Sequence, residues 1–267
     1  MSVSPANEET TYGVTHCKAR RARRHGSDWS RVTSSRLAKI LAQLALRGAD
    51  GSGTMHLCEI SAEVSGTTGA GIMLQSDELV RGSLCTTDGV AAYLDDLQYT
   101  LGEGPSIDAH RLGQVVAEPE LASPDADRWP GLKSSALQAG ARAMFAFPIR
   151  IGAVRLGALT LYRDEAGPIE GDRHTDTLVM TDVAAHTIVA MQANAPPGSI
   201  AVELEDGANF HFVVHRAAGM LSEQLGVGVA EALVRLRSYA FLSDTPIDDV
   251  AEAVVARRLR LGDWDGT

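Results

Sequence analysis

Aromatic residues are scarce in this chain of 267 residues: Trp, Tyr and Phe together make up 5%. Proteins that bind nucleic acid by stacking bases need a platform of such rings, so this kind of site is excluded. Hydrophobic residues at 45% and charged residues at 22% are ordinary values for a soluble globular protein. We expect cores built from Ala, Leu and Val, in one large domain or two small ones.

Long hydrophobic runs are also missing. The longest, at 144–149 and 156–162, fall far short of the roughly 20 residues that a membrane-spanning helix needs. The first ten residues lack the basic and apolar regions of a secretory signal. The three cysteines are an odd number at unrelated spacings and provide no disulfide framework. We therefore expect no membrane partner and a reducing, cytoplasmic compartment.

Motifs for common cofactors are absent as well. There is no GxxxxGK[ST] run, and no GxGxxG follows a strand, which excludes nucleotide hydrolysis and dinucleotide binding by these motifs. His211 and His215 have helical i, i+4 spacing but no third ligand nearby, so we expect an exposed or hydrogen-bonded pair rather than a metal site. No cofactor is identified from the sequence.

Charge is unevenly distributed. The total is −10, with +4 over residues 1–36 and −12 over 37–207, whereas residues 208–261 carry six charges of each sign. So acidic a middle block is a poor surface for nucleic acid, and no DNA partner is indicated.

Changes in composition and helix-breaking residues divide the chain into four parts. Residues 1–34 are predicted to be a disordered basic arm, which is either a nonspecific contact for anions or a solvated leader. Residues 35–193 form the first folded unit, and NAPPGS within 194–208 marks a linker, because proline breaks a helix. Residues 209–262 form the second folded unit.

Hydrophobic periodicity predicts an α+β first unit with an antiparallel sheet. Helices are expected at 35–46, where Leu37, Ile40, Leu41 and Leu44 share one face, and at 55–64 and 172–192. Strands are expected at 69–75 and 78–87, and as a hairpin at 143–151 and 156–163. Residues 93–101 are either helix or loop, and 119–134 are rich in loop residues.

The second unit is predicted to be a bundle of three helices. The first ends at GVG (226–228), and the second carries apolar residues on one face up to Ala240. The third is expected to begin at TPID (245–248), with Thr245 as its cap, Pro246 in the first position and Asp248 as a capping-box acid.

The run from Val213 to Val255 resembles the ANTAR family, small three-helix RNA-binding domains of bacterial antiterminators. The residues that carry the resemblance include Ala217, Gly219, Leu221, Gly226, Ala232, Leu236, Arg237, Ala240, Val250, Ala251 and Val255. The first unit looks like a GAF domain of the type that accompanies ANTAR in actinobacterial proteins, through QYTLGEGPSIDA and the PIRIGAVRLGALTLY hairpin.

The resemblance implies binding of a paired-hairpin element in a nascent transcript, which stops a terminator from forming. The family often has Gln-Ala-Lys-Gly where this chain has Arg216, Ala217, Ala218 and Gly219, so the basic side chain is displaced by two positions. Because RNA contact requires cations for phosphates, the candidate RNA-binding residues are Arg216, Ala217, Gly219, Arg235, Arg237, Arg257 and Arg258.

Each of these residues also has a purely structural interpretation. Arg237 could pair with Glu231 or Asp244 to hold the bundle together, and Gly219 could permit close helix packing. The near-neutral charge of the second unit likewise leaves open a protein-interaction or dimerisation module that does not bind RNA.

Three further hypotheses concern the first unit. An unknown small ligand could occupy its cup, lined near residues 101–106 and 145–149, or the unit could serve only as a dimerisation scaffold. GAF-fold domains can reduce methionine sulfoxide with paired cysteines, but Cys58 and Cys85 lack flanking basic residues that lower a thiol pKa. We expect two small buried hydrophobes and no enzyme. The helices at 35–46 and 172–192 predict a homodimer.

Overall fold

The computed structural model describes residues 34–47, 53–75, 80–124, 128–193, 204 and 211–261. Nearly all of the predicted basic arm, and all of the predicted linker except Leu204, lie outside the described residues. Leu204 is buried, with 2% of its surface exposed, in the core of the N-terminal unit. At least this position of the predicted linker therefore packs as part of the first unit.

Five antiparallel strands form one sheet in the order β2-β1-β5-β4-β3. The strands are β1 (Gly69–Gln75), β2 (Val80–Thr86), β3 (Val116–Glu118), β4 (Ala143–Ile151) and β5 (Val154–Arg163). The predicted hairpin is confirmed, with Ile151 opposite Val154 beside a tight turn. Strands β1 and β5 approach so closely that a Cβ at Gly157 would lie 2.0 Å from the Met73 carbonyl oxygen, so this position requires glycine.

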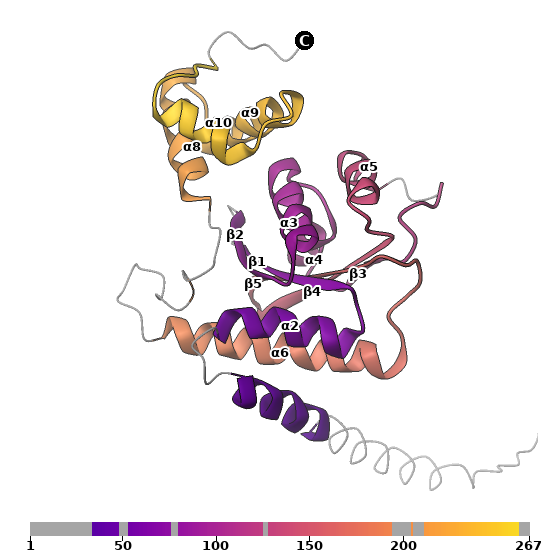
Figure 1. Cartoon of the computed structure of the whole chain (residues 1–267). Coiled ribbons are helices and arrows are strands. Elements are labelled where there is room, and N and C mark those ends of the chain that lie inside the picture. Colours follow the sequence, from indigo (N-terminus) through magenta and orange to yellow (C-terminus); the bar gives the residue numbers. More distant parts are fainter. Residues whose placement is uncertain are drawn as a thin grey trace, which may run out of the picture.

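Helices cover both faces of the sheet (Figure 1). Helices α2 (Gly53–Ser65) and α6 (Gly171–Gln192) lie on one face, and α3 (Gly89–Leu101), α4 (Pro105–Leu112) and α5 (Pro130–Gln138) lie on the other. Successive side chains of β4 point to opposite faces of the sheet and so contribute to two cores. Phe145 and Phe147 join the core with α2 and α6, whereas Met144 and Ala146 join the opposite core. The predicted α+β fold with an antiparallel sheet is confirmed.

The ends of α3 are set by local signals. The Asp88 carboxylate accepts hydrogen bonds from the backbone N–H groups of Val90 and Ala91, as an N-cap does. Gly102 ends the helix in the left-handed conformation, with φ of 67°. The residues that were expected to be helix or loop are thus helical. The short strand β3 and the helices α4 and α5 were not predicted.

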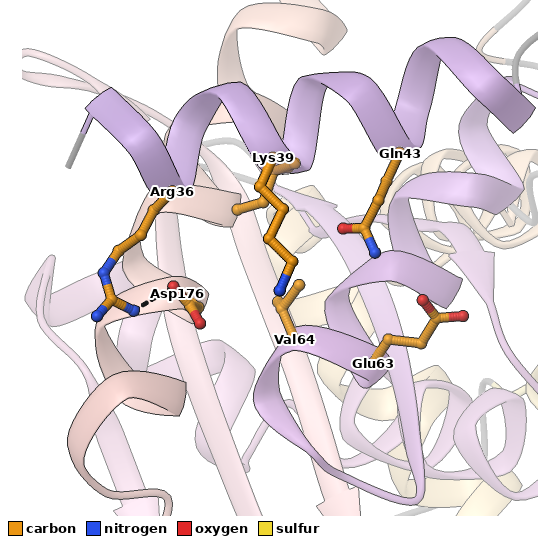
Figure 2. A pocket seen from close by; sticks show the side chains of 7 residues that line it. Arg36, Lys39, Gln43, Glu63, Val64 and Asp176 are labelled. Carbon is orange, nitrogen blue, oxygen red and sulfur yellow. Dashed lines mark hydrogen bonds and ion pairs between the residues drawn. The ribbon is translucent and has the colours of Figure 1, made fainter. Parts of the chain in front are cut away.

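The helix over 34–47 packs against the outer side of α2 and α6. Ile40 is buried, and Arg36 forms ion pairs with two carboxylates of α6, Asp172 at 2.5 Å and Asp176. Figure 2 shows the contact with Asp176. Leu37 and Leu41 remain 38% and 48% exposed. Only part of the predicted apolar face therefore packs within this chain.

The C-terminal unit consists of α8 (Phe212–Leu225), α9 (Val229–Leu242) and α10 (Ile247–Val255), which confirms the three predicted helices. Its core contains Ala217, Leu221, Leu236, Val250 and Val254. Gly226 ends α8 with a positive φ, and Gly228 is the N-cap of α9.

The predicted start of the third helix is wrong by one residue. Pro246, rather than Thr245, occupies the N-cap position, and no side chain caps the helix. The Thr245 hydroxyl donates to the carbonyl oxygen of Ser243, and the Asp248 carboxylate is engaged by His211. These competing partners remove both side chains from the capping box.

Candidate nucleic-acid interface

Three of the predicted arginines are exposed on the C-terminal unit. Arg216 lies in the second turn of α8, and Arg257 and Arg258 follow the last turn of α10. His211, just before α8, contacts Asp248 in the first turn of α10, so these two helices begin at the same end of the unit. Nine helical residues rise about 13 Å. Arg216 therefore lies toward one end of the C-terminal unit, and Arg257 and Arg258 lie toward the other end.

The two arginines of α9 have different surroundings. Arg235 forms an i, i+4 ion pair with Glu231 at 2.7 Å and is partly exposed. The Arg237 guanidinium lies over the ring of Tyr99 in the N-terminal unit, 5.3 Å from its centroid. The structure shows Arg237 paired with neither Glu231 nor Asp244, so the interpretation that it holds the bundle together by these pairs is wrong.

The remaining two candidates are apolar or lack a side chain. Ala217 is completely buried in the core of the bundle, so in this arrangement it is a packing residue. Gly219 is exposed, and a Cβ placed there would meet nothing within 4 Å. The interpretation of Gly219 as a site of close helix packing is therefore wrong, and its backbone is open to an incoming ligand.

Tyr99 of α3 is the centre of the boundary between the two units. Its ring stacks on His211 at a centroid distance of 4.0 Å, and His215 meets it edge-on at 6.5 Å. Tyr99 and Met73 are almost completely buried and belong to the same apolar cluster as the core of the bundle. Aromatic pairs and a cation over a ring each add roughly 1 kcal/mol. Tyr99 is not among the site residues predicted from the sequence.

His211 joins the units through two carboxylates. Its Nδ1 lies 2.8 Å from Asp248 of α10, and its Nε2 lies 3.4 Å from Asp96 of α3. Burial alone would lower the pKa of His211, but the contacts with Asp248 and Asp96 outweigh it and raise the pKa to about 9. His211 is therefore a buried cation at neutral pH. No cluster of three potential metal ligands occurs among the described residues.

Arg237 carries a second buried charge at this boundary. Its Nε and Nη2 atoms are buried without a hydrogen-bond partner. Burial lowers the pKa of the guanidinium, which still stays protonated at neutral pH. A Cβ on Gly102 would lie 3.0 Å from its Nη1, so the end of α3 closes over this side chain. The N-terminal unit thus covers part of the guanidinium, although the residue as a whole is partly exposed.

Packed side chains fill the side of the sheet that faces α3. Asp95 is completely buried and accepts a hydrogen bond from the Ser83 hydroxyl, and Gln98 accepts from Ser106. Phe145 and Phe147, which were expected near a ligand cup, face α2 and α6 instead. A cavity of about 290 Å³ lies instead at the boundary, lined by residues that include Asp96, His211 and Asp248.

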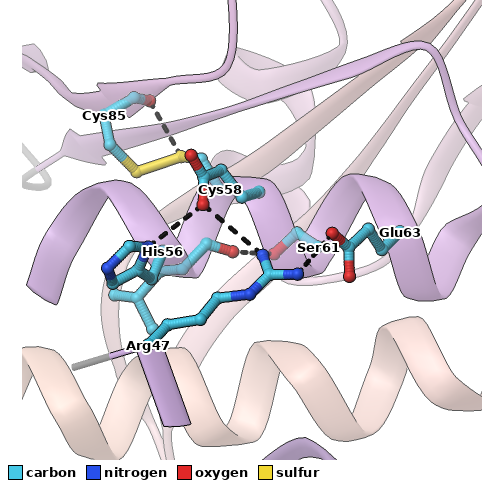
Figure 3. Close-up of polar contacts among 8 residues, drawn as sticks. Arg47, His56, Cys58, Ser61, Glu63 and Cys85 are labelled. Atoms are coloured by element: carbon cyan, nitrogen blue, oxygen red, sulfur yellow. Dashed lines mark hydrogen bonds and ion pairs between the residues drawn. A yellow bond between two sulfur atoms is a disulfide. The ribbon is translucent and has the colours of Figure 1, made fainter. Parts of the chain in front are cut away.

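Cys58 and Cys85 form a disulfide between α2 and β2 (Figure 3). Both residues are buried, at 0% and 4% exposure, as expected, but the expectation of unpaired cysteines is wrong. Their Cα atoms are 6.2 Å apart although 27 positions separate them in the chain. Packing of α2 against the sheet brings them together, and spacing in the sequence does not encode this contact.

Comparison with known proteins agrees with the two-unit architecture. Residues 203–255 match the model of the ANTAR domain family, so the three-helix unit is an ANTAR domain. A search of curated proteins found no match. None of the helices in the described ranges is long and apolar enough to cross a bilayer.

Solved structures similar to the N-terminal part include two GAF domains from phosphoenolpyruvate-protein phosphotransferases. The Acinetobacter domain is 9% identical, covers 61% of this chain and 96% of its own, and has a TM-score of 0.47. The Coxiella burnetii domain is 14% identical, with coverages of 60% and 95% and a TM-score of 0.45. A free methionine-R-sulfoxide reductase from Thermoplasma acidophilum is 12% identical, with coverages of 49% and 86% and a TM-score of 0.38.

Proposed function

We propose that this protein is a cytoplasmic transcription antitermination regulator. Its ANTAR domain binds a paired-hairpin element in nascent RNA under the control of the GAF-like unit. The observation that carries this proposal is the ANTAR match over residues 203–255. Three exposed arginines, Arg216, Arg257 and Arg258, and the open backbone at Gly219 supply groups that could contact phosphates and loop bases. Because the proposed partner is a nascent transcript, we propose the cytoplasm as the compartment.

The experiment is a gel-shift titration of the full chain with a two-hairpin RNA at several salt concentrations. We expect binding that weakens with salt, and a triple change of Arg216, Arg257 and Arg258 to Ala should weaken binding further and reduce the salt dependence. A triple change of Arg142, Arg150 and Arg155 to Ala is the matched control, because these are three exposed arginines of the N-terminal unit. A folded chain that fails to shift the RNA at tens of micromolar would overturn the proposal.

The alternative function is a protein-interaction module that does not bind RNA. The six positive and six negative charges over residues 208–261 favour it, because phosphate neutralisation supplies most sequence-independent affinity for RNA. Salt-independent capture of a protein partner, with no RNA shift, would support this alternative. A reductase role would need thiols that a substrate can reach, whereas Cys58 and Cys85 are buried and bonded to each other.

A homodimer is the assembly that we propose. Apolar side chains remain exposed on the helix over 34–47, at Leu37 and Leu41, and on α6, at Leu178 and Val189. Burying such faces against a second copy is favourable. Light scattering should give a dimer for the full chain and a monomer for Leu41→Glu. A wild-type monomer at tens of micromolar would exclude the dimer.

A further inference from the structure

The residues at the boundary between the two units suggest how the RNA-binding surface is controlled. Arg237 is an arginine of the ANTAR domain, yet its guanidinium lies over Tyr99 and beside Gly102 of the N-terminal unit. In this position two of the three guanidinium nitrogens, Nε and Nη2, are buried and cannot reach a phosphate. Exposing them requires α9 to separate from the end of α3.

We propose that the structure is a closed state of low RNA affinity, in which α3 of the GAF-like unit covers Arg237 and a latch of Asp96, His211 and Asp248 holds it there. This inference rests on the proposed function, because it names the regulation of the same RNA-binding surface. The opened protein has α9 and Arg237 released from Tyr99.

The chemistry of the latch explains why it closes. His211 is 3% exposed and lies between the Asp96 and Asp248 carboxylates, so one buried cation is shared by both units. Tyr99 covers one side of the imidazole, with Arg237 and His215 against the same ring. Breaking one carboxylate contact weakens the boundary without opening the core of either unit.

The position of the latch also favours a regulated boundary over a permanent one. Asp96 is half exposed, and the cavity of about 290 Å³ reaches Asp96, His211 and Asp248. The charged contacts can therefore exchange with water or with another molecule. A second cavity, of about 260 Å³, lies where Gly102 and Leu101 meet Val234, Arg237 and Phe241, so packing between α3 and α9 is incomplete.

The test uses full-length Asp96→Ala, which removes one carboxylate of the latch at a half-exposed position. Asp249→Ala is the matched control, because it makes the same change of charge next to Asp248 on an exposed position. Hydrogen exchange of the peptides spanning α3 and α9 reports opening, and a gel shift with the two-hairpin RNA reports affinity.

We expect Asp96→Ala to raise exchange in α9 and to tighten RNA binding by at least about tenfold, whereas Asp249→Ala does neither. In the Asp96→Ala background, Arg237→Ala should cancel the gain. Unchanged exchange and unchanged affinity in Asp96→Ala would overturn the latch while leaving RNA binding intact. Raised exchange with no RNA binding by any variant would establish the latch and overturn the proposed function. Raised exchange with RNA affinity equal to wild type would show that the boundary does not mask the surface.

Discussion

Asp95 shows how a single buried carboxyl group changes the stability of this fold. It is fully enclosed between α3 and the sheet, where a Cβ on Gly71 would lie 2.4 Å from its Oδ2. Burial raises the pKa of Asp95 to about 7, although the hydrogen bond from Ser83 opposes the shift. The protonated form is therefore favoured in the folded protein more than in the unfolded chain.

The substitution Asp95→Asn tests this reading. In the wild type, the protonated Asp95 carboxyl group stabilises the folded state. This contribution is fully present below the unfolded pKa of 3.8 and is lost as pH rises through about 7. The amide cannot ionise, so the variant should lack this loss and be more stable than wild type at about pH 8. Urea unfolding at about pH 4 and pH 8 measures the difference. An equal pH dependence in both proteins would show that Asp95 does not titrate in this range.

Gly219 provides a second prediction at the residue scale. It lies within α8 with open space around it. Gly219→Ala should stabilise the folded chain by roughly 0.5–1 kcal/mol, because alanine loses less conformational freedom in a helix. If RNA approaches the bare backbone here, the same change should weaken RNA binding. Thermal unfolding and gel shift on the same sample separate these effects, and a stabilised variant with unchanged affinity would remove Gly219 from the RNA-binding surface.

At the scale of elements, α3 is the helix that links the sheet to the ANTAR domain. One side contributes Asp95 and Gln98 to the packed interior of the N-terminal unit, and Tyr99 reaches the core of the three-helix bundle. Asp96 faces His211. Any change that moves α3 relative to the sheet is thereby transmitted to α9 and α10.

The boundary that α3 forms should loosen at alkaline pH. The pKa of His211 is about 9 in the folded protein against 6.5 for the ordinary imidazole, so its stabilising contribution, on the order of 3 kcal/mol, is complete below about pH 6.5 and is lost as pH rises through about 9. Asp96, Asp248, Tyr99, Arg237 and His215 are the charged or titratable groups around it.

Hydrogen exchange of α9, corrected for the intrinsic effect of pH, measures this loosening. We expect protection to fall between about pH 7 and pH 10 in the wild type. His211→Gln cannot carry the charge, so its α9 should be poorly protected throughout this range. Equal, pH-independent protection in both proteins would contradict the role of the His211 cation.

At the scale of the whole molecule, the two folded units and most of their elements follow from the sequence. The β4–β5 hairpin, α6 and the three C-terminal helices have clear periodicity and turn residues, and the structure confirms them. The short elements β3, α4 and α5 were missed because three, eight and nine residues give little periodic signal. The disulfide was missed because α2 and β2 are neighbours only in the folded sheet.

The candidate site was predictable only in part. The ANTAR pattern identified Arg237, and arginine content identified Arg216, Arg257 and Arg258, because these features are local in the chain. Arg237 is covered by the ring of Tyr99, which is more than a hundred positions away in the sequence. This contact depends on how the two units pack. His211 was expected to be exposed or hydrogen-bonded, but its two partners were not predicted, since neither carboxylate is close to it in sequence.

The most direct test of the account is the RNA affinity of the full chain, measured over a salt titration for wild type, Asp96→Ala and Asp249→Ala. The account predicts salt-sensitive binding to the two-hairpin RNA, at least about tenfold tighter in Asp96→Ala than in the other two proteins. Absence of binding in all three, while hydrogen exchange shows them folded and α9 of Asp96→Ala exposed, would contradict an RNA-binding role for this protein.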